Sequence, residues 1–398
     1  MDIGLVHRNE YKVEADKPEH LSVAEAPGRV HFLGEQGGAD AILFLSAAID
    51  RHVKVSVSAR KDSSLRFFAS DLNERKRSTL VNLKYRREDR WANYIKVAIH
   101  AFAELGFTVK GLNFTVCGNI PQQVALASST AIEIAAAMAL RGYFSAKISK
   151  KGLVEKLAGS HAALFGKNAR VADYIIGLCA QKDHFFIVDE SARKVIKKIK
   201  SPLTDYSVLL IDSRVPRMGE ESEVELRLAD TKKGLGLLRQ KQAGASFKDF
   251  MAYDLMELME DFPEKIRRRS MHIIQELRRV HDTGGALERK EFPAFARTII
   301  SSHESLRDLY EVSCPEVDWL VKRAQESDSV AGSRMTGSGF GGCTYTFIRS
   351  EMLEEYKKRL EEYERIFGFR PIIHEVKLAA GSRSVLAPGR VCADTAHQ

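Results

Sequence analysis

Apolar residues recur in two kinds of pattern along the first half of the chain. Residues 53–57 alternate apolar and polar positions in the order V-K-V-S-V, which is typical of a strand. Residues 128–140 contain Ala, Ile and Met without Pro or Gly, which predicts a buried helix with Ser128 and Ser129 at its N-cap. Short runs of apolar and β-branched residues predict further strands at 112–117, 185–188 and 208–212.

The second half of the chain is more helical. Charged segments with apolar residues at helical spacing predict helices at 220–239, 247–259 and 264–281. A glycine-rich segment at 333–343 then separates the helices from a strand at 344–348. Because strands and helices do not follow a regular βαβ order, we predict an α+β fold.

A break in the pattern near residue 200, in the sequence SPLTDYS, predicts a boundary between two domains. We expect an N-terminal domain at 1–200, a C-terminal domain at 201–386 and a frayed tail at 387–398. A chain of 398 residues is long enough for two domains of ordinary size.

Composition and charge narrow the classes of function. The chain is 44% hydrophobic and 29% charged, as expected for a globular protein and not for a disordered or fibrous one. Its net charge of +8 is dispersed among acidic residues, which favours solvated helix faces over a nucleic-acid interface; a basic excess also suits a polyanionic nucleotide. Five widely spaced cysteines without a CxxC argue against a disulfide framework or a zinc site. No signal peptide or membrane-spanning run is evident, so we expect a cytoplasmic protein without a membrane partner.

Three segments carry residues suited to chemistry, and the first is APGRVHFLGE at 26–35. It places Arg29 and Glu35 six positions apart around an apolar stretch. The planar guanidinium of Arg29 suits a phosphate or a carboxylate. On spacing alone, a surface turn in which Arg29 forms an ordinary salt bridge is the favoured interpretation.

The second and third segments are rich in small residues. Residues 118–131 join a strand to the predicted buried helix, where backbone N–H groups and the helix dipole favour an anion; the hydroxyls of Ser128 and Ser129 could bind phosphate or magnesium. A loop with ordinary N-capping serines is the alternative. Residues 334–343 contain four glycines within six positions, which predicts close backbone approach to a phosphate or to another loop.

Taken together, APGRVHFLGE, the loop at 121–131 and SRMTGSGFGGC resemble the three signature motifs of the GHMP small-molecule kinases. Within that family the resemblance is greatest to the galactokinases, and segments 90–96 and 305–318 add to it. The resemblance implies a two-domain fold, with an N-terminal ribosomal-protein-S5-like α/β domain, a C-terminal α+β domain and an active site in the cleft between them. It also implies ATP with Mg²⁺ and a small sugar as partners, no nucleic acid, and a monomer or weak dimer.

The resemblance also implies roles for individual residues. Segment 168–174 resembles the CGIMDQ motif, so Asp173 would be the catalytic carboxylate and Arg29 the catalytic guanidinium. An acid beside the acceptor hydroxyl can take or orient its proton, and a guanidinium can hold that acid ionised and offset phosphoryl charge. Considered without the resemblance, Asp173 is also consistent with an ordinary acidic residue on the surface of a helix. The sugar would contact Asp173, Glu35, Gln36 and Gly38. ATP phosphates would contact Pro121, Gln123, Ala125, Ser128, Ser129, Gly337, Gly339 and Gly341. Magnesium would be bound by Ser129 and Glu133.

The sequence departs from the family pattern at the site itself. The family has Gly at the positions of Gln123 and Ala125, where a side chain in a left-handed conformation costs roughly 1–2 kcal/mol. A sugar-binding Asp aligns with Gly38 and a sugar-side Tyr with Val224, and each unpartnered hydroxyl weakens binding by about 1–3 kcal/mol. Three functions therefore stay open: a galactose kinase, a kinase of another small acceptor, and a non-catalytic relative that binds a ligand or a partner.

Overall fold

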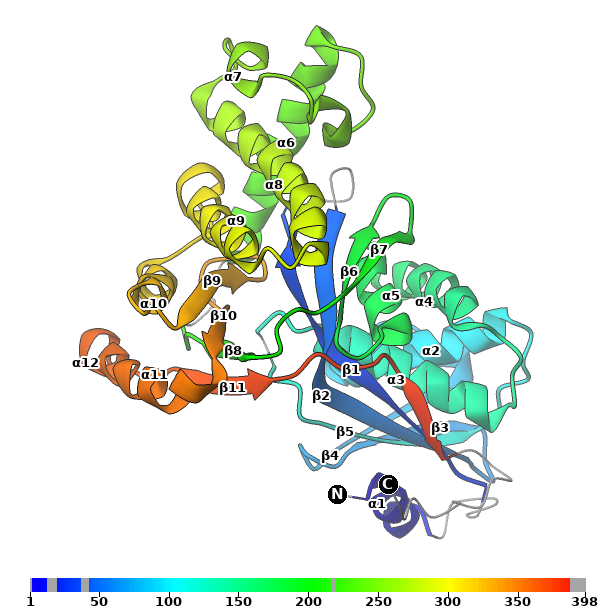
Figure 1. The fold of residues 1–398 in the computed structure, drawn as a ribbon. Coiled ribbons are helices and arrows are strands. Elements are labelled where there is room, and N and C mark those ends of the chain that lie inside the picture. Colours follow the sequence, from blue (N-terminus) through cyan, green and yellow to red (C-terminus); the bar gives the residue numbers. More distant parts are fainter. Residues whose placement is uncertain (1, 13–19, 37–42, 123, 216–219, 387–398) are drawn as a thin grey trace.

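A computed structural model describes residues 2–12, 20–36, 43–122, 124–215 and 220–386 of the chain. Gly38, Gln123 and the tail from residue 387, for which the sequence makes predictions, lie outside the described residues. The described part contains two β-sheets, each with helices packed on it (Figure 1). The predicted α+β organisation is confirmed.

The first sheet has eight strands and is built mainly from the first half of the chain. Its central path runs β12-β1-β2-β5-β3-β4, and β6 pairs with both β2 and β7. Every pairing is antiparallel except that of β3 with β5. The strands are β1 (Ser22–Leu33), β2 (Leu43–Ala59), β3 (Ser64–Ala69), β4 (Glu74–Thr79), β5 (Leu112–Gly118), β6 (His184–Asp189), β7 (Lys194–Lys200) and β12 (Arg383–Leu386).

Four helices pack on one face of this sheet. Val55 and Val57 of β2 point toward that face and are buried in the core. Ser56 and Ser58 alternate with them and point to the opposite face, where they hydrogen-bond His7 of the short helix α1. The helices are α1 (Ile3–Glu10), α2 (Ala92–Glu104), α3 (Ser128–Tyr143), α4 (Lys150–Phe165) and α5 (Val171–Cys179).

The second sheet is antiparallel, with strand order β11-β8-β10-β9. The chain enters it between Lys200 and Tyr206 and returns to the first sheet with β12, which pairs with β1. Its strands are β8 (Tyr206–Asp212), β9 (Val330–Thr336), β10 (Cys343–Arg349) and β11 (Ile372–Val376). The helices of this half are α6 (Glu220–Lys241), α7 (Leu255–Leu258), α8 (Glu264–Glu288), α9 (Phe292–Ser305), α10 (Pro315–Gln325), α11 (Leu353–Arg359) and α12 (Glu362–Phe367).

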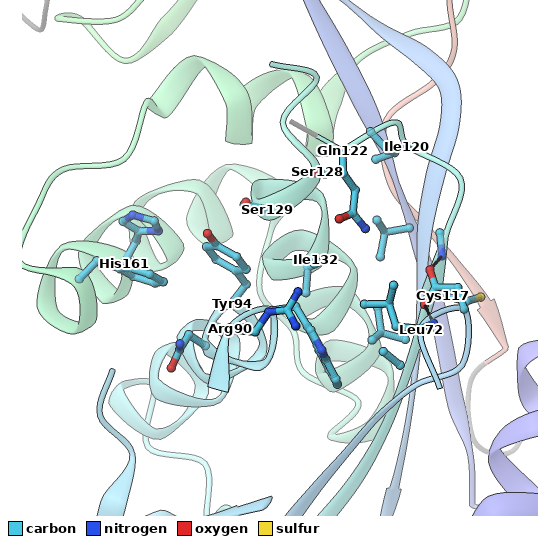
Figure 2. A pocket seen from close by; sticks show the side chains of 18 of the residues that line it. Leu72, Arg90, Tyr94, Cys117, Ile120, Gln122, Ser128, Ser129, Ile132 and His161 are labelled. Atoms are coloured by element: carbon cyan, nitrogen blue, oxygen red, sulfur yellow. Dashed lines mark hydrogen bonds between the residues drawn. The ribbon is translucent and has the colours of Figure 1, made fainter. Parts of the chain in front are cut away.

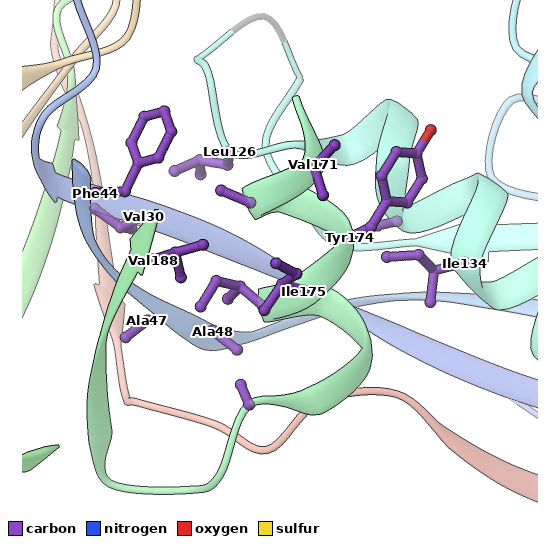
Figure 3. Close-up of a cluster of buried hydrophobic side chains, with 14 of the residues drawn as sticks. Val30, Phe44, Ala47, Ala48, Leu126, Ile134, Val171, Tyr174, Ile175 and Val188 are labelled. Atoms are coloured by element: carbon purple, nitrogen blue, oxygen red, sulfur yellow. The ribbon is translucent and has the colours of Figure 1, made fainter. Parts of the chain in front are cut away.

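One hydrophobic core runs through both halves. Phe32 on β1 contacts Phe185 of the first sheet and both Tyr345 and Phe347 of the second, with ring centroids 5.0–5.5 Å apart. On the helical side of the first sheet, Val171 and Ile175 of α5 pack against residues of β1, β2 and α3 (Figure 3). This packing fixes α5, and therefore its first turn, relative to β1.

Three local predictions were wrong. Segment 26–35 is not a surface turn, because its residues up to Leu33 lie in β1 with every side chain buried. Residues 333–336, expected in a glycine-rich loop, belong to β9. The helix predicted at 247–259 is broken: Asp254 accepts the N–H groups of Met256 and Glu257 and so starts a new short helix.

The other predicted strands and helices are present, most of them within a few residues at their ends; however, β2 starts ten residues before the predicted strand at 53–57, and α8 ends seven residues after the predicted helix at 264–281. Among the described residues, none of the helices is both long and apolar enough to cross a membrane.

Three histidines buried in this fold are kept neutral. His7, His31 and His272 each have a pKa lowered from 6.5 to about 3, and burial is the largest cause in every case. Between pH 6.5 and 3 the unfolded chain therefore binds protons that the folded chain does not. The free energy of unfolding must fall as the pH falls through this window.

We expect a drop from pH 7 to pH 5 to reduce the free energy of unfolding by on the order of 2 kcal/mol for each of these histidines. Urea unfolding at both pH values measures it. The His7→Gln variant keeps a donor and an acceptor toward Thr115 and Ser58. Its free energy of unfolding should therefore decrease by about 2 kcal/mol less between pH 7 and pH 5 than that of the parent chain. Equal free energies at pH 7 and pH 5 in the parent chain would contradict the expectation.

Candidate active site

The two predicted catalytic residues meet in the structure. Arg29 lies on β1 and Asp173 in the first turn of α5, 144 positions later. Arg29 Nε donates to Asp173 Oδ1 at 2.6 Å and Nη2 donates to Oδ2 at 3.1 Å, which makes a bidentate ion pair. Both residues are buried, so the interpretation of Asp173 as a surface acid is wrong. The third nitrogen, Nη1, donates to the carbonyl of Ala125 at 2.6 Å and ties the pair to the loop before α3.

His31, which the sequence reasoning missed, supports Asp173 from the same strand. It lies two residues after Arg29 and therefore on the same face of β1. Its Nε2 is 3.0 Å from Asp173 Oδ1, and its Nδ1 is 2.5 Å from the hydroxyl of Ser46. Because burial and Arg29 lower the pKa of His31 to about 3, the ring is neutral; its Nε2–H donates to Asp173 while Ser46 donates to Nδ1.

Asp173 is held as a carboxylate. Burial alone would raise its pKa, but the charge of Arg29 and the hydrogen bond from His31 outweigh burial and hold the pKa well below its usual range. The turn that carries Asp173 is itself fixed, because Glu190 accepts the N–H groups of Val171 and Ala172 at 2.6 and 2.7 Å. The site therefore presents an ionised acid in one defined position.

The loop before α3 keeps the backbone shape expected of glycines. Ala125 and Ala127 have φ of 60° and 59°, in the left-handed region. Arg29 stabilises this loop, since its backbone N–H donates to the carbonyl of Leu126 at 3.1 Å. Helix α3 starts at Ser128 with Ala127 as its N-cap and no side-chain cap, so the prediction of N-capping by Ser128 and Ser129 was wrong. No side chain of the described residues accepts from the first-turn N–H groups of α3, as an anion site requires.

A cavity of about 490 Å³ opens beside this helix start (Figure 2). Ser128 and Ser129 line it, and so do Ile120 and Gln122, the neighbours of Pro121; Pro121 does not line it. The cavity has aromatic walls and basic side chains at its edge. These are Tyr85, Trp91, Tyr94 and Phe165, with Arg87, Arg90 and Lys167.

Segment 90–96, which the sequence singled out only as part of the family resemblance, contributes Arg90, Trp91 and Tyr94 to this cavity. Nothing in the sequence marked His161 or Phe165. They come from α4, and the ring of His161 stacks on Phe165 with centroids 4.5 Å apart.

Glu133 lies deeper in α3, where its carboxylate already has two donors. His161 Nδ1 approaches it at 2.8 Å and the hydroxyl of Tyr174 donates to its second oxygen. Burial raises the pKa of Glu133, against the effect of both donors. The described residues contain no group of three or more His, Cys, Asp or Glu placed to hold a metal ion. Magnesium binding by Ser129 and Glu133 stays a prediction.

The third segment packs against other loops. Gly337, Gly339 and Gly341 have φ of 97°, 106° and 116°. A Cβ on Gly339 would lie 2.4 Å from the carbonyl oxygen of Val312, and one on Gly341 would lie 2.9 Å from the Cβ of Val215. Of the two predicted partners for these glycines, another loop accounts for the close approach. Contact with ATP phosphates stays a prediction.

Glu35 joins the first segment to the third. Its carboxylate accepts the N–H of Gly337 at 2.8 Å and a charged hydrogen bond from Arg334 Nη1 at 3.3 Å. Arg334 is fully buried and also pairs with Glu276 of α8 at 3.3 Å. Gln36 donates to the carbonyl of Gly337 at 2.9 Å. Both predicted sugar-binding residues are thus fixed by the protein, and their contact with a sugar stays a prediction.

A second cavity, of about 290 Å³, lies beside Arg29. Glu35, Gln36, Ala125 and Gly337 line it, so it collects residues from all three segments. Val224 of α6 lines it too, at the position where the family has a Tyr. The sequence reasoning did not single out its remaining lining residues, which are Arg170, Arg227, Leu228, Tyr310, Val312 and Ser338.

Comparison with known proteins identifies the family. The profiles "GHMP kinases N terminal domain" and "GHMP kinases C terminal" match residues 93–179 and 285–363. A Treponema pallidum protein named "Putative galactokinase" is 38% identical over 394 residues, which cover 95% of this chain and 94% of its own. Thermotoga maritima galactokinase is 29% identical over 362 residues, 91% of this chain and 99% of its own. The crystal structure of Lactococcus lactis galactokinase complexed with galactose has a TM-score of 0.86 at 22% identity, and covers 96% of this chain and 100% of its own.

The family matches and the named relatives define a small-molecule kinase, an ATP-dependent phosphotransferase. The chain belongs to the GHMP kinase family, and the full-length relatives quoted above carry the name galactokinase. The two-domain GHMP kinase fold expected from the three segments is therefore confirmed.

The left-handed loop yields a stability prediction. Ala125→Gly should raise the free energy of unfolding by about 1 kcal/mol, because glycine adopts φ near 60° without steric strain. Ala163→Gly is the matched control: this exposed alanine lies within α4, where glycine should lower stability by about 1 kcal/mol. Chemical unfolding of the three proteins measures both changes. Equal destabilisation by the two substitutions would show that Ala125 is not strained.

Proposed function

We propose that this kinase transfers the γ-phosphate of ATP to the anomeric hydroxyl of galactose or a related sugar. The proposal rests on the position of the loop at 125–129. Its first residue, Ala125, lines the smaller cavity with Arg29, whereas Ser128 and Ser129 line the larger one. A nucleotide in the larger cavity would therefore have its phosphates at the start of α3, next to an acceptor in the smaller cavity.

The larger cavity suits a nucleotide. Trp91 and Tyr94 offer faces on which a base can stack, and the neighbouring basic residues complement phosphate charge. The free N–H groups at the start of α3 would receive a phosphate.

The Arg29–Asp173 pair would carry the chemistry. The carboxylate of Asp173 orients the acceptor hydroxyl toward the γ-phosphorus and accepts its proton as the new bond forms. Because its pKa lies well below the usual range, Asp173 is a weak base, which suits a loose transition state in which the proton leaves late. Arg29 holds the carboxylate in place through two hydrogen bonds and anchors the loop through the third.

Magnesium would accompany the nucleotide. Mg²⁺ keeps several waters and binds substrate phosphates with few protein ligands, and when bound it neutralises charge on them. The residues present fit that arrangement: the hydroxyl of Ser129 faces the larger cavity, while Glu133 is buried against His161 and Tyr174. We propose Ser129 as the protein ligand closest to the phosphates.

A different acceptor is the second candidate, and the aliphatic side chain of Val224 in the smaller cavity favours it. A non-catalytic role is the third candidate, and the loss of the loop glycine at Ala125 favours it. Location in the cytoplasm and a monomer or weak dimer stay predictions.

Mg-ATP should raise the melting temperature, because a ligand that binds only the folded state stabilises it by about 2.7 kcal/mol at a hundred times its Kd. Trp91→Ala should raise the Kd about tenfold, as expected for a lost stacking face. Trp319→Ala is the control, since the second tryptophan packs on Tyr363 and Phe367 away from the cavity. Thermal shift and titration calorimetry measure these effects. The absence of any stabilisation by Mg-ATP would remove both kinase candidates.

Asp173→Asn should lower kcat by about 10²–10⁴-fold, because the amide cannot accept the hydroxyl proton. Its Kd for Mg-ATP should stay near that of the parent chain. The control is Asp183→Asn: this acid is exposed and has φ of 57°, which asparagine tolerates. Coupled ADP-release assays with galactose and other sugars measure turnover. A fully active Asp173→Asn protein would refute the catalytic role.

A further inference from the structure

Among the described residues, the smaller cavity contains one guanidinium that makes no ion pair. Arg29 is paired with Asp173, and Glu35 with Arg334. Arg227 makes an ion pair with Glu223 at 3.0 Å and gives its other nitrogens to backbone carbonyls. Each of these three charged lining residues therefore has an oppositely charged partner within the protein.

Arg170 differs from them. Its guanidinium makes one hydrogen bond, from Nη2 to the carbonyl of Glu35 at 3.3 Å, and lies 5.1 Å over the ring of Phe44. Among the described residues it has no ion pair, and the nearby Glu190 gives both carboxylate oxygens to the N–H groups of Val171 and Ala172. A half-buried guanidinium with free donors favours an anion.

The sequence context agrees with a changed acceptor. Arg170 lies three residues before Asp173, where the CGIMDQ motif has its glycine. Three aliphatic side chains also line the cavity, those of Val224, Leu228 and Val312. The cavity has therefore lost a polar partner for sugar hydroxyls and gained a guanidinium, while Asp173 lies behind its partner Arg29 and is not itself a lining residue.

We propose that the acceptor is a monosaccharide that carries a carboxylate, a hexuronic acid, whose carboxylate binds Arg170 while its anomeric hydroxyl faces Asp173. This inference rests on the proposed kinase function and specifies its substrate class. A volume of about 290 Å³ suits a single sugar ring. One free guanidinium matches one negative charge, and its planar fork matches a carboxylate.

The reaction balances as a phosphoryl transfer. A bond forms between the γ-phosphorus and the anomeric oxygen, and the bond from the γ-phosphorus to the ADP oxygen breaks. The hydroxyl proton passes to Asp173 and then to solvent. The carboxylate of the sugar takes no part in the bond changes and serves only in recognition.

The test is an ADP-release assay of the full chain with Mg-ATP and three acceptors: galacturonate, galactose and galactose 6-phosphate. We expect kcat/KM for galacturonate to exceed that for galactose at least tenfold. Arg170→Met should lower kcat/KM for galacturonate at least tenfold more than that for galactose, mainly through KM. Arg193→Met, at an exposed arginine that pairs with Glu155 outside both cavities, should leave the ratio of the two values unchanged.

Each other outcome has a defined meaning. Faster turnover of galactose than of galacturonate, or equal effects of Arg170→Met on both, overturns the uronate proposal and leaves the kinase function standing. A higher kcat/KM for galactose 6-phosphate than for galacturonate would mean that Arg170 binds a phosphate. This outcome also overturns the uronate proposal. No turnover of any acceptor, with no stabilisation by Mg-ATP, refutes the kinase function itself. If Mg-ATP binds but no acceptor reacts, an unchanged melting temperature with galacturonate overturns the proposal, and a rise that Arg170→Met abolishes supports it.

Discussion

The ion pair between Arg29 and Asp173 holds three segments of the site in one arrangement. Two nitrogens of the guanidinium bind the carboxylate on α5, and the third binds the carbonyl of Ala125 in the loop before α3. Removing one partner of such a buried pair leaves an uncompensated charge, which lowers the free energy of unfolding by roughly 3–5 kcal/mol. The position of the acid, the course of the loop and the start of α3 therefore depend on one side chain of β1. Catalysis by positioning requires this kind of rigidity.

A second buried network fixes the two halves of the molecule against each other. Arg334 on β9 lies between Glu35, just after β1, and Glu276 on α8. Burial would raise the pKa of Glu276, but Arg334 and Arg279 lower it to about 2, so Glu276 stays ionised as a partner of Arg334. Since Arg29 and Glu35 come from one short segment, the strand that positions Asp173 also leads into the contact with the second sheet. The smaller cavity, which Arg29 and Glu35 both line, is therefore held in shape by these two buried networks.

The elements of the fold could largely be predicted from local patterns, whereas the site could not. Alternation and composition suffice for β2 and α3 because each pattern lies within its own element. No such pattern connects Arg29 with Asp173, and only the resemblance to a family placed them together. His31 was within reach, since a strand puts residues two apart on one face, yet its partner acid comes from another element. His161 depends on how α4 packs and had no signal in the sequence.

The replacement of glycine by Ala125 changes the energy of the loop more than its local backbone shape. Ala125 and Ala127 both adopt left-handed φ, at roughly 1–2 kcal/mol each. The two hydrogen bonds from Arg29 to this loop offset part of that strain, because a bond from a charged donor contributes about 1.5–3 kcal/mol and a neutral one about 1 kcal/mol. A methyl group is also the smallest side chain that can replace glycine there. The backbone N–H groups at the start of α3 therefore stay open to an anion even though alanine replaces glycine at position 125.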